Sequence, residues 1–447
     1  MHIDFLDTLH CPYCDSKLRT VKIIDSKADT IEYGIVECNC FSYPVVGGIL
    51  YLKIDSFNAM AKDCLSINKK LSALHQLIIS RRSLKDKIFD RIRRYSLLQE
   101  FLNNHEEKTS GQSIVRLSSM NLYQTVDALN WGTWGDYVKY RYSADSFFET
   151  LPFLSLLKDK EEYALDHSCG LGHYSNVIQE AFPLLKIVCT DMNFSFLWLT
   201  KKHCVNNAQL LCLDEAAPLP FPDNSFTGIL NSDAFPYFVS KALLAKEFHR
   251  VISPAGIIIL THLHNPLAKQ WKGMPIPPSA YTVLFKGLPM NVIPGKSAVE
   301  GLFADSLDFS KRYDSHEIDS SDSVNIIISE NVDVFRSRTN IRNDILVGRG
   351  NLIINPIYEI TEQDNSLNLK MRMPNPFYEE DNPFLRKYLP KEYTIHRQEI
   401  THEKMIQDMV DRFILVNVPA SFVAPDNTRR WDMIKSQFSP LQELRRA

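Results

Sequence analysis

Short apolar runs, several of which end in an acidic or polar residue, recur through the middle of the chain. They lie at residues 163–166, 186–190, 209–213, 226–231 and 256–262, and the segments between them are long enough for helices. Buried strands that alternate with helices are typical of a parallel sheet with helices on both faces. The pattern therefore predicts a doubly wound, Rossmann-like α/β core whose parallel strands are these five runs.

The first run leads into a turn of small residues, Asp166-His-Ser-Cys-Gly-Leu-Gly172, before the next helical segment. Gly170 and Gly172 allow the backbone to approach a bound nucleotide and the helix to pack on the strand. The second run ends at Asp191, where doubly wound folds bind ribose hydroxyls. Any one acid could simply end a strand or cap a helix. The ordered set predicts one cofactor site.

Three later segments, 210–215, 219–226 and 248–260, follow in the order seen in a known family. The chain resembles the class I, type-11 group of S-adenosylmethionine-dependent methyltransferases. The resemblance implies that Asp166 lies beneath the amino-acid part of the cofactor, Asp191 binds the ribose, and Asp214 or Glu215 lies near the adenine. The predicted cofactor-binding residues are Asp166, Ser168, Gly170, Gly172, Asp191, Met192, Asp214, Glu215 and Tyr142.

Ser168 departs from the family pattern, which has a glycine at this position. If the position needs a positive φ, a side chain could crowd the methionine end of the cofactor. Its hydroxyl could equally donate a hydrogen bond to the cofactor carboxylate. We expect altered cofactor binding rather than its loss.

Four of the nine cysteines cluster near the start, as Cys11-Pro-Tyr-Cys14 and Cys38-Asn-Cys40. Two such pairs can place four thiolates tetrahedrally around zinc, and four thiolates leave no open position for catalysis. With residues 40–50, the segment resembles the small zinc-ribbon domain that serves elsewhere as an activator subunit of RNA and release-factor methyltransferases. We therefore expect a structural Zn²⁺ on Cys11, Cys14, Cys38 and Cys40; disulfides are the alternative, which a cytosolic protein disfavours.

The family core has seven strands, so two more strands should close the sheet. Residues 392–398 and 413–419 are strand-like and predict this closing pair. The expected division is a zinc ribbon (1–55), a helical linker (56–120), a methyltransferase core (121–265), an inserted mixed α+β cap (266–389), and the completion of the core with a tail (390–447). The insertion leaves the sheet at its ligand-binding edge, so we expect it to cover the acceptor; homodimer contacts are its alternative role.

Two further segments have two interpretations each. A basic stripe at residues 81–94 is either a solvated helix face or a binding surface for a phosphate-bearing substrate. The aromatic segment 131–142, which includes Tyr142, either covers the cofactor or packs in the core.

Methyl transfer mainly requires that the acceptor atom be held in line with the sulfonium methyl group. A base is needed only if the acceptor is an alcohol, an amide or a protonated amine. The candidate catalytic residues follow the fourth and fifth runs: Asp233, Tyr237, His262 and His264. Only one of the two histidines is expected to face the pocket.

Composition narrows the function only slightly. With 447 residues, 45% hydrophobic residues and a net charge of -3, the chain is neither disordered nor strongly basic. Its apolar runs are too short to span a membrane and no signal-peptide pattern is present, so we expect a cytoplasmic protein without a membrane partner. The near-neutral charge does not favour a nucleic-acid partner and does not exclude one. The predicted function is methyl transfer to a small-molecule acceptor in specialised metabolism. The alternatives are methylation of RNA or a translation protein, which the ribbon supports, and a catalytically silent cofactor-binding or assembly module, which Ser168 suggests.

Overall fold

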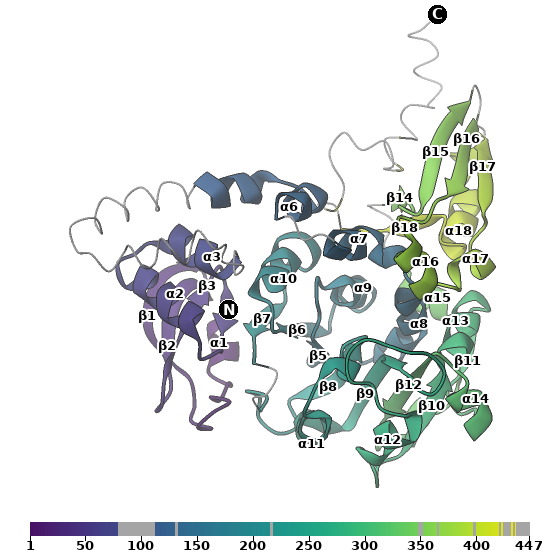
Figure 1. The fold of residues 1–447 in the computed structure, drawn as a ribbon. Helices are drawn as coiled ribbons and strands as arrows, with labels where there is room; N and C mark the ends of the chain where they lie inside the picture. Colours follow the sequence, from purple (N-terminus) through teal and green to yellow (C-terminus); the bar gives the residue numbers. More distant parts are fainter. Residues whose placement is uncertain are drawn as a thin grey trace, which may run out of the picture.

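A mixed sheet of eleven strands runs through the molecule (Figure 1). The computed structural model describes residues 1–78, 112–129, 133–214, 218–346, 352–363, 366–396, 399–419, 422, 431 and 434. The strand order is β1-β2-β3-β4-β7-β6-β5-β8-β9-β12-β10. No helix in these described ranges has both the length and the apolar character needed to cross a bilayer.

The five expected runs form the centre of this sheet. They are β5 (Tyr163–His167), β6 (Lys186–Asp191), β7 (Gln209–Cys212), β8 (Phe226–Ser232) and β9 (Ile252–His264). Neighbouring strands in the order β7-β6-β5-β8-β9 pair in parallel. This arrangement confirms the predicted α/β fold, and it brings the carboxyl ends of these strands to one edge of the sheet.

The strands are buried on both faces because their side chains alternate between two hydrophobic clusters. Ala164 of β5 belongs to the cluster that contains α9 (His173–Ala181) and α10 (Phe194–Leu199). Leu165 belongs to the cluster that contains α11 (Lys241–Val251). Helices on both faces explain why these strands are continuously apolar in sequence.

The sheet closes with strands other than the predicted pair. β12 (Ser323–Ile328) pairs antiparallel with β9, and β10 (Met290–Pro294) pairs antiparallel with β12. The predicted closing strands instead form β17 (Glu392–His396), in a three-stranded sheet, and β18 (Leu415–Asn417), which pairs with β14 (Leu352–Ile354). The prediction for 392–398 and 413–419 is therefore wrong, and 266–389 is not a single insertion.

Burial explains this difference. All six residues of β12 are buried, as a strand inside a covered sheet requires. β17 has only one buried residue and packs at the edge of the small sheet formed with β15 (Tyr358–Gln363) and β16 (Ser366–Met371). A strand with one polar face suits a small sheet that is covered on one side.

The N-terminal segment extends the same sheet. β1 (Arg19–Lys27), β2 (Thr30–Glu37), β3 (Ser42–Val46) and β4 (Ile49–Tyr51) form an antiparallel meander. β4 then pairs in parallel with β7, with Leu50 opposite Leu211. The meander thus covers what would be the exposed edge of β7. The basic stripe at 81–94 lies outside the described residues.

Two helices lie at the carboxyl edge, α7 (Thr133–Tyr140) and α8 (Asp145–Leu154) (Figure 1). Every residue of α8 is buried, and the hydroxyl of Thr150 contacts those of Ser232 and Thr261 at the ends of β8 and β9. The remaining elements are α1 (Ile3–Leu6), α2 (Ser56–Ser66), α3 (Lys70–Ile78), α6 (Leu122–Ala128), α12 (Pro278–Val283), α13 (Gly295–Phe303), β11 (Ser306–Asp308), α14 (Ser315–Asp319), β13 (Ser337–Thr339), α15 (Ile341–Ile345), α16 (Pro376–Asp381), α17 (Leu385–Tyr388), α18 (Glu403–Asp411) and the short helical turns Arg141–Ser143, Ser155–Leu157, Thr200–Cys204, Phe235–Tyr237 and Val332–Val334.

Candidate functional site

The turn between β5 and α9 has the backbone of a cofactor loop. Ser168, Gly170 and Gly172 have φ angles of 59°, 56° and 70°. A Cβ atom on Gly172 would lie 2.6 Å from Cγ2 of Thr200, so both the φ angle and the packing require glycine here. Ser168 adopts the positive φ that normally favours glycine, and its Oγ lies 3.3 Å from Nδ1 of His167.

Asp191, at the end of β6, holds this loop in position through a hydrogen bond. Its Oδ2 accepts a hydrogen bond from the backbone N–H of Gly170 at 3.0 Å, and its Oδ1 accepts one from Asn193 at 2.7 Å. Hydrogen bonds to a carboxylate are shorter and stronger than neutral ones. The acid predicted to bind the ribose therefore also positions the loop that approaches the cofactor.

Asp166 at the end of β5 is almost completely buried. It is 2% exposed and accepts a hydrogen bond from the hydroxyl of Ser175 in α9. Burial raises the pKa of Asp166 to about 6, although the contact with Ser175 opposes this effect. A buried carboxylate at this position can attract a cationic ligand group.

A cleft opens between this loop and the ends of β6 and β7. Its lining residues are His167, Ser168, Thr190, Asp191, Met192, Leu213, Asp214, Leu219, Phe238 and Leu244. Four of the predicted cofactor-binding residues share it: Ser168, Asp191, Met192 and Asp214. The sequence analysis missed Leu213, Leu219, Phe238 and Leu244, because these residues come from separate segments. Glu215 lies outside the described residues.

The aromatic segment before β5 contributes a different residue from the one predicted. Tyr142 packs against Phe147, His173 and Phe422, with ring centroids 5.1, 5.1 and 5.5 Å away. Tyr137 of α7 instead lies over the loop, where its hydroxyl is 3.8 Å from the position that a Cβ on Gly170 would occupy. For Tyr142 the packing agrees with the core alternative, and that Tyr137 covers the cofactor stays a prediction.

The candidate catalytic residues meet at the carboxyl ends of β8 and β9. Oδ1 of Asp233 lies 3.2 Å from Nε2 of His264 and 3.9 Å from Nε2 of His262. The expectation that only one histidine faces this site is wrong. Between Leu260 and Leu263, β9 has one residue more than β12, and His262 has a φ of 51°. Residues two apart point to the same side of a strand, so His262 and His264 share a face in any case. The β-bulge shifts the alternation by one residue, so that Leu260 and Leu263 lie together on the other face.

Two buried charged residues that the sequence analysis missed complete this cluster. Oε2 of Glu149 lies 2.8 Å from Nδ1 of His262, and it also accepts a hydrogen bond from the hydroxyl of Ser323 at 2.8 Å. Nη1 of Arg141 donates to Oδ2 of Asp233 at 3.2 Å. A glutamate within the apolar run of 147–154 is the sequence signal that could have identified Glu149.

The charges in this cluster stabilise one another. Burial opposes protonation of His262, but the carboxylates of Glu149 and Asp233 outweigh it and raise its pKa to about 9. Burial likewise opposes ionisation of Asp233, yet His262, His264 and Arg141 hold its pKa well below the usual range. Burial raises the pKa of Tyr237 to about 12, and the ring of Tyr237 packs edge-on against His264 at 5.6 Å.

Part of the expected cap lies beside these residues. The indole of Trp271 stacks on the imidazole of His264, with centroids 4.2 Å apart and planes 12° from parallel. Residues of α16 and the segments around it contact α7 and α8, because Asn375 donates to Asp136 and Asn382 accepts from the backbone N–H of Asp145. That these segments bind the acceptor stays a prediction.

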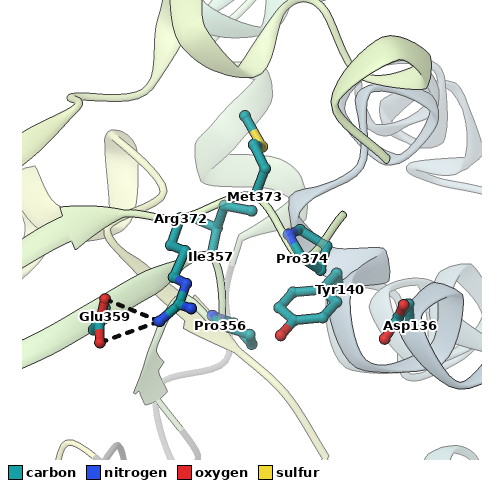
Figure 2. A pocket seen from close by; sticks show the side chains of 8 residues that line it. All are labelled: Asp136, Tyr140, Pro356, Ile357, Glu359, Arg372, Met373 and Pro374. Atoms are coloured by element: carbon teal, nitrogen blue, oxygen red, sulfur yellow. Dashed lines mark hydrogen bonds and ion pairs between the residues drawn. The ribbon is translucent and has the colours of Figure 1, made fainter. Parts of the chain in front are cut away.

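A separate cavity of about 400 Å³ lies between α7 and the small C-terminal sheet (Figure 2). Its lining residues are Asp136, Tyr140, Pro356, Ile357, Glu359, Arg372, Met373 and Pro374. Figure 2 shows Arg372 directed toward Glu359, and the two side chains form an ion pair at 3.4 Å. None of the predicted site residues lines this cavity.

The four N-terminal cysteines converge as a zinc site requires. Their sulfur atoms all lie within 4.8 Å of one another. The Sγ of Cys40 is 3.7 Å from that of Cys11 and 3.4 Å from that of Cys38, close to the separation of about 3.8 Å that tetrahedral Zn–S bonds of 2.3 Å impose. All nine cysteines lie within the described residues, and none of them forms a disulfide. The geometry fits zinc, which would hold the two turns of the meander together.

Comparison with known protein families identifies the kind of domain that the middle of the chain forms. Residues 165–260 match the model of a methyltransferase domain. These residues form a methyltransferase domain. The segment runs from β5 through β9, and it includes the cofactor loop, Asp191 and Asp233. The domain is of the S-adenosylmethionine-dependent class, as the motif order indicated.

Three curated relatives match this domain. A 2-methyl-6-phytyl-1,4-hydroquinone methyltransferase of Synechocystis is 29% identical over 96 residues, which are 22% of this chain and 30% of the relative. A demethylmenaquinone methyltransferase of Thermotoga maritima is 25% identical over 26% of this chain and 51% of its own length. A ubiquinone/menaquinone biosynthesis C-methyltransferase of Cupriavidus necator is 29% identical over 28% of this chain and 50% of its own. The chain thus spans about half or less of each relative.

Solved methyltransferase structures also align with the chain. An S-adenosylmethionine-dependent methyltransferase of Aquifex aeolicus matches with a TM-score of 0.30 and 14% identity, over 46% of this chain and 96% of that one. A TehB-like S-adenosylmethionine-dependent methyltransferase of Corynebacterium glutamicum matches with a TM-score of 0.30 and 12% identity, over 40% of this chain and 86% of that one.

Proposed function

We propose that the protein transfers a methyl group from S-adenosylmethionine to a small-molecule acceptor. The observation that carries the proposal is the loop with positive φ at Ser168, Gly170 and Gly172, fastened to Asp191 inside the matched methyltransferase domain. In this proposal the loop holds the methionine part of the cofactor near Asp166. Asp191 holds the ribose, and the cleft up to Asp214 receives the adenine.

The acceptor is proposed to bind at the ends of β8 and β9. There, the carboxylate of Asp233 and the imidazoles of His262 and His264 adjoin the aromatic surfaces of Trp271 and Tyr237. Polar groups at one end of an aromatic site suit a hydroxylated ring, which the polar groups would orient or deprotonate. The names of the curated relatives, which include a hydroquinone methyltransferase, agree with this class of acceptor.

Burial supports a small molecule over a macromolecule. His262 is 8% exposed and His264 is 2% exposed, so an acceptor atom must enter an enclosed space. Methylation of RNA or of a translation protein is the second proposal, favoured by the resemblance of residues 1–55 to a methyltransferase activator. A net charge of -3 gives no electrostatic support for RNA binding. A silent cofactor-binding module is the third, since Ser168 has the positive φ that disfavours a side chain.

Calorimetric titration with S-adenosylmethionine first tests whether the cofactor binds. Methyl-labelled cofactor would then be incubated with a panel of phenols and hydroquinones, with RNA, and with ribosomal and release-factor proteins. Transfer to the small molecules alone supports the proposal. Transfer to RNA or protein alone would replace it with the second function, and binding without any transfer would favour the third.

Cofactor affinity is expected to depend on the ionisation of Asp166. Its pKa of about 6 means that the carboxyl group is mainly charged above this pH and neutral below it. If the charged form attracts the cationic cofactor, affinity falls as pH drops below about 6, by up to about tenfold per pH unit. Calorimetry between pH 5 and 8 checks this. Asp166→Asn should bind more weakly at pH 8 and lose this pH dependence, and a wild-type affinity that is flat across the range would contradict the role of Asp166.

A further inference from the structure

We propose that Asp233, His262 and His264 bind a divalent transition-metal cation, at a site distinct from the four cysteines. One atom of each side chain lies within 4.8 Å of the other two, with Oδ1 of Asp233 at 3.2 Å and 3.9 Å from the Nε2 atoms of His264 and His262. Ligands about 2.1 Å from a shared metal lie about 3.0 to 3.4 Å from one another. The distance from Asp233 to His264 lies within this range, and the distance to His262 is about half an ångström longer.

The backbone builds this convergence. His262 has a φ of 51° within the bulge of β9, and Asp233, directly after β8, has a φ of 58°. Residues other than glycine adopt this conformation at a cost, and such residues concentrate at functional sites. In a regular β9 the two imidazoles would still share a face, but counted from Leu260 it would be the face that this leucine occupies. Within the bulge, the backbone N–H of His262 donates a hydrogen bond to Oδ1 of Asn325 at 3.0 Å.

The surrounding side chains hold the ligands as they do around many metals. Glu149 contacts Nδ1 of His262 at 2.8 Å, which leaves Nε2 as the nitrogen that faces Asp233. Such carboxylate–histidine pairs orient metal ligands and increase their basicity. Arg141 donates to Oδ2 of Asp233, and Oδ1 remains the oxygen that faces both imidazoles. Trp271 covers the ring of His264 at 4.2 Å and thereby limits its motion.

The ligand types select the metal class. Two imidazoles and one carboxylate suit Zn²⁺, Fe²⁺, Co²⁺ or Mn²⁺, whereas Mg²⁺ and Ca²⁺ prefer oxygen ligands throughout. Three protein ligands leave coordination positions open, unlike the four thiolates of the ribbon. The part of this inference that concerns catalysis rests on the proposed function. There, the cation would bind a hydroxyl oxygen of the acceptor and stabilise its anion for attack on the methyl group.

Manganese is the probe that separates this site from the ribbon, because four thiolates bind this hard cation poorly. The full-length protein would be titrated with Mn²⁺ without a chelator, and the free ion followed by its electron paramagnetic resonance signal. The total metal content of the protein would be measured in parallel, because a site that already holds another cation would not take up Mn²⁺. We expect one cation per chain beyond the ribbon zinc, and at least tenfold weaker Mn²⁺ binding in His264→Ala and Asp233→Asn.

Glu149→Gln tests the contact between Glu149 and Nδ1 of His262, and we expect about 10-fold to 100-fold weaker Mn²⁺ binding. Asp223→Asn is the matched control, because Asp223 is an exposed acid of the same domain, and it should leave the Mn²⁺ titration unchanged. Cofactor titration of each variant verifies that the fold is intact. Absence of a second cation in wild-type protein, or a second cation that His264→Ala and Asp233→Asn both retain, would overturn the site. If the protein transfers methyl groups without a cation at this site, the site is overturned but the proposed function is not.

Discussion

Replacing Asp191 with alanine is expected to weaken S-adenosylmethionine binding at least tenfold, or about 1.4 kcal/mol. The carboxylate has two functions in the structure. It accepts the backbone N–H groups of Gly170 and Asn193, and it borders the cleft where the ribose is proposed to lie. A carboxylate oxygen can accept more than one hydrogen bond, so the backbone contacts do not prevent contact with ribose hydroxyls. Loss of both functions makes this one of the largest effects that we predict.

Calorimetry with wild-type protein, Asp191→Ala and Asp191→Asn measures this effect. The asparagine variant retains one acceptor oxygen without the charge, so its affinity should lie between those of the other two proteins. Asp223→Ala is the matched control, because Asp223 is an exposed acid of the same domain and its side chain is 71% accessible. Wild-type affinity in Asp191→Ala, with an unchanged melting temperature, would show that the cofactor does not bind in this cleft.

The parts of the fold that follow from the sequence are those with a strong local pattern. Each central strand is an apolar run buried on both faces, and the loop after β5 contains glycines where the backbone needs positive φ. Asp191 follows from its place at the end of a strand. These features depend on a few neighbouring residues, so one sequence suffices to predict them.

The closing strands and the catalytic cluster depend on contacts between distant segments. Both 323–328 and 392–396 are strand-like, and only their partners decide which one enters the central sheet. The fully apolar run at Ile326–Ile328 favoured the first, but its distance from β9 in sequence obscured the pairing. The bulge at His262 is set by its register against β12, and Glu149 reaches His262 only because α8 crosses the carboxyl edge. No local pattern specifies these contacts.

Removal of one zinc ligand, in Cys11→Ser, is expected to reduce the zinc content by one equivalent per chain and to unfold the β1–β3 meander. Cys11 is 2% exposed, and its Sγ lies 3.7 Å from that of Cys40 and 3.3 Å from the hydroxyl of Tyr43. Binding of a structural zinc typically supplies about 10 kcal/mol or more, which a small meander cannot replace with its own core. Metal analysis and amide exchange of β2 measure the two effects.

Cys64→Ser is the matched control, because Cys64 is a partly buried cysteine outside the cluster and forms no disulfide. It should keep the zinc and the exchange protection of β2.

The cofactor site should respond less than the ribbon does. Two contacts join the N-terminal segment to the core: the backbone N–H of Leu52 donates to the carbonyl of Cys212 at 2.9 Å, and Nζ of Lys53 donates to the carbonyl of Met192 at 3.2 Å. Asp191 and the glycine loop, however, both belong to the core. Cofactor affinity in Cys11→Ser should therefore fall by less than tenfold. Full zinc content and unchanged exchange in this variant would show that the four cysteines do not hold a metal. A loss of cofactor binding as large as that in Asp191→Ala would instead show that the strand pairing of β4 with β7 transmits the ribbon's stability to the cleft.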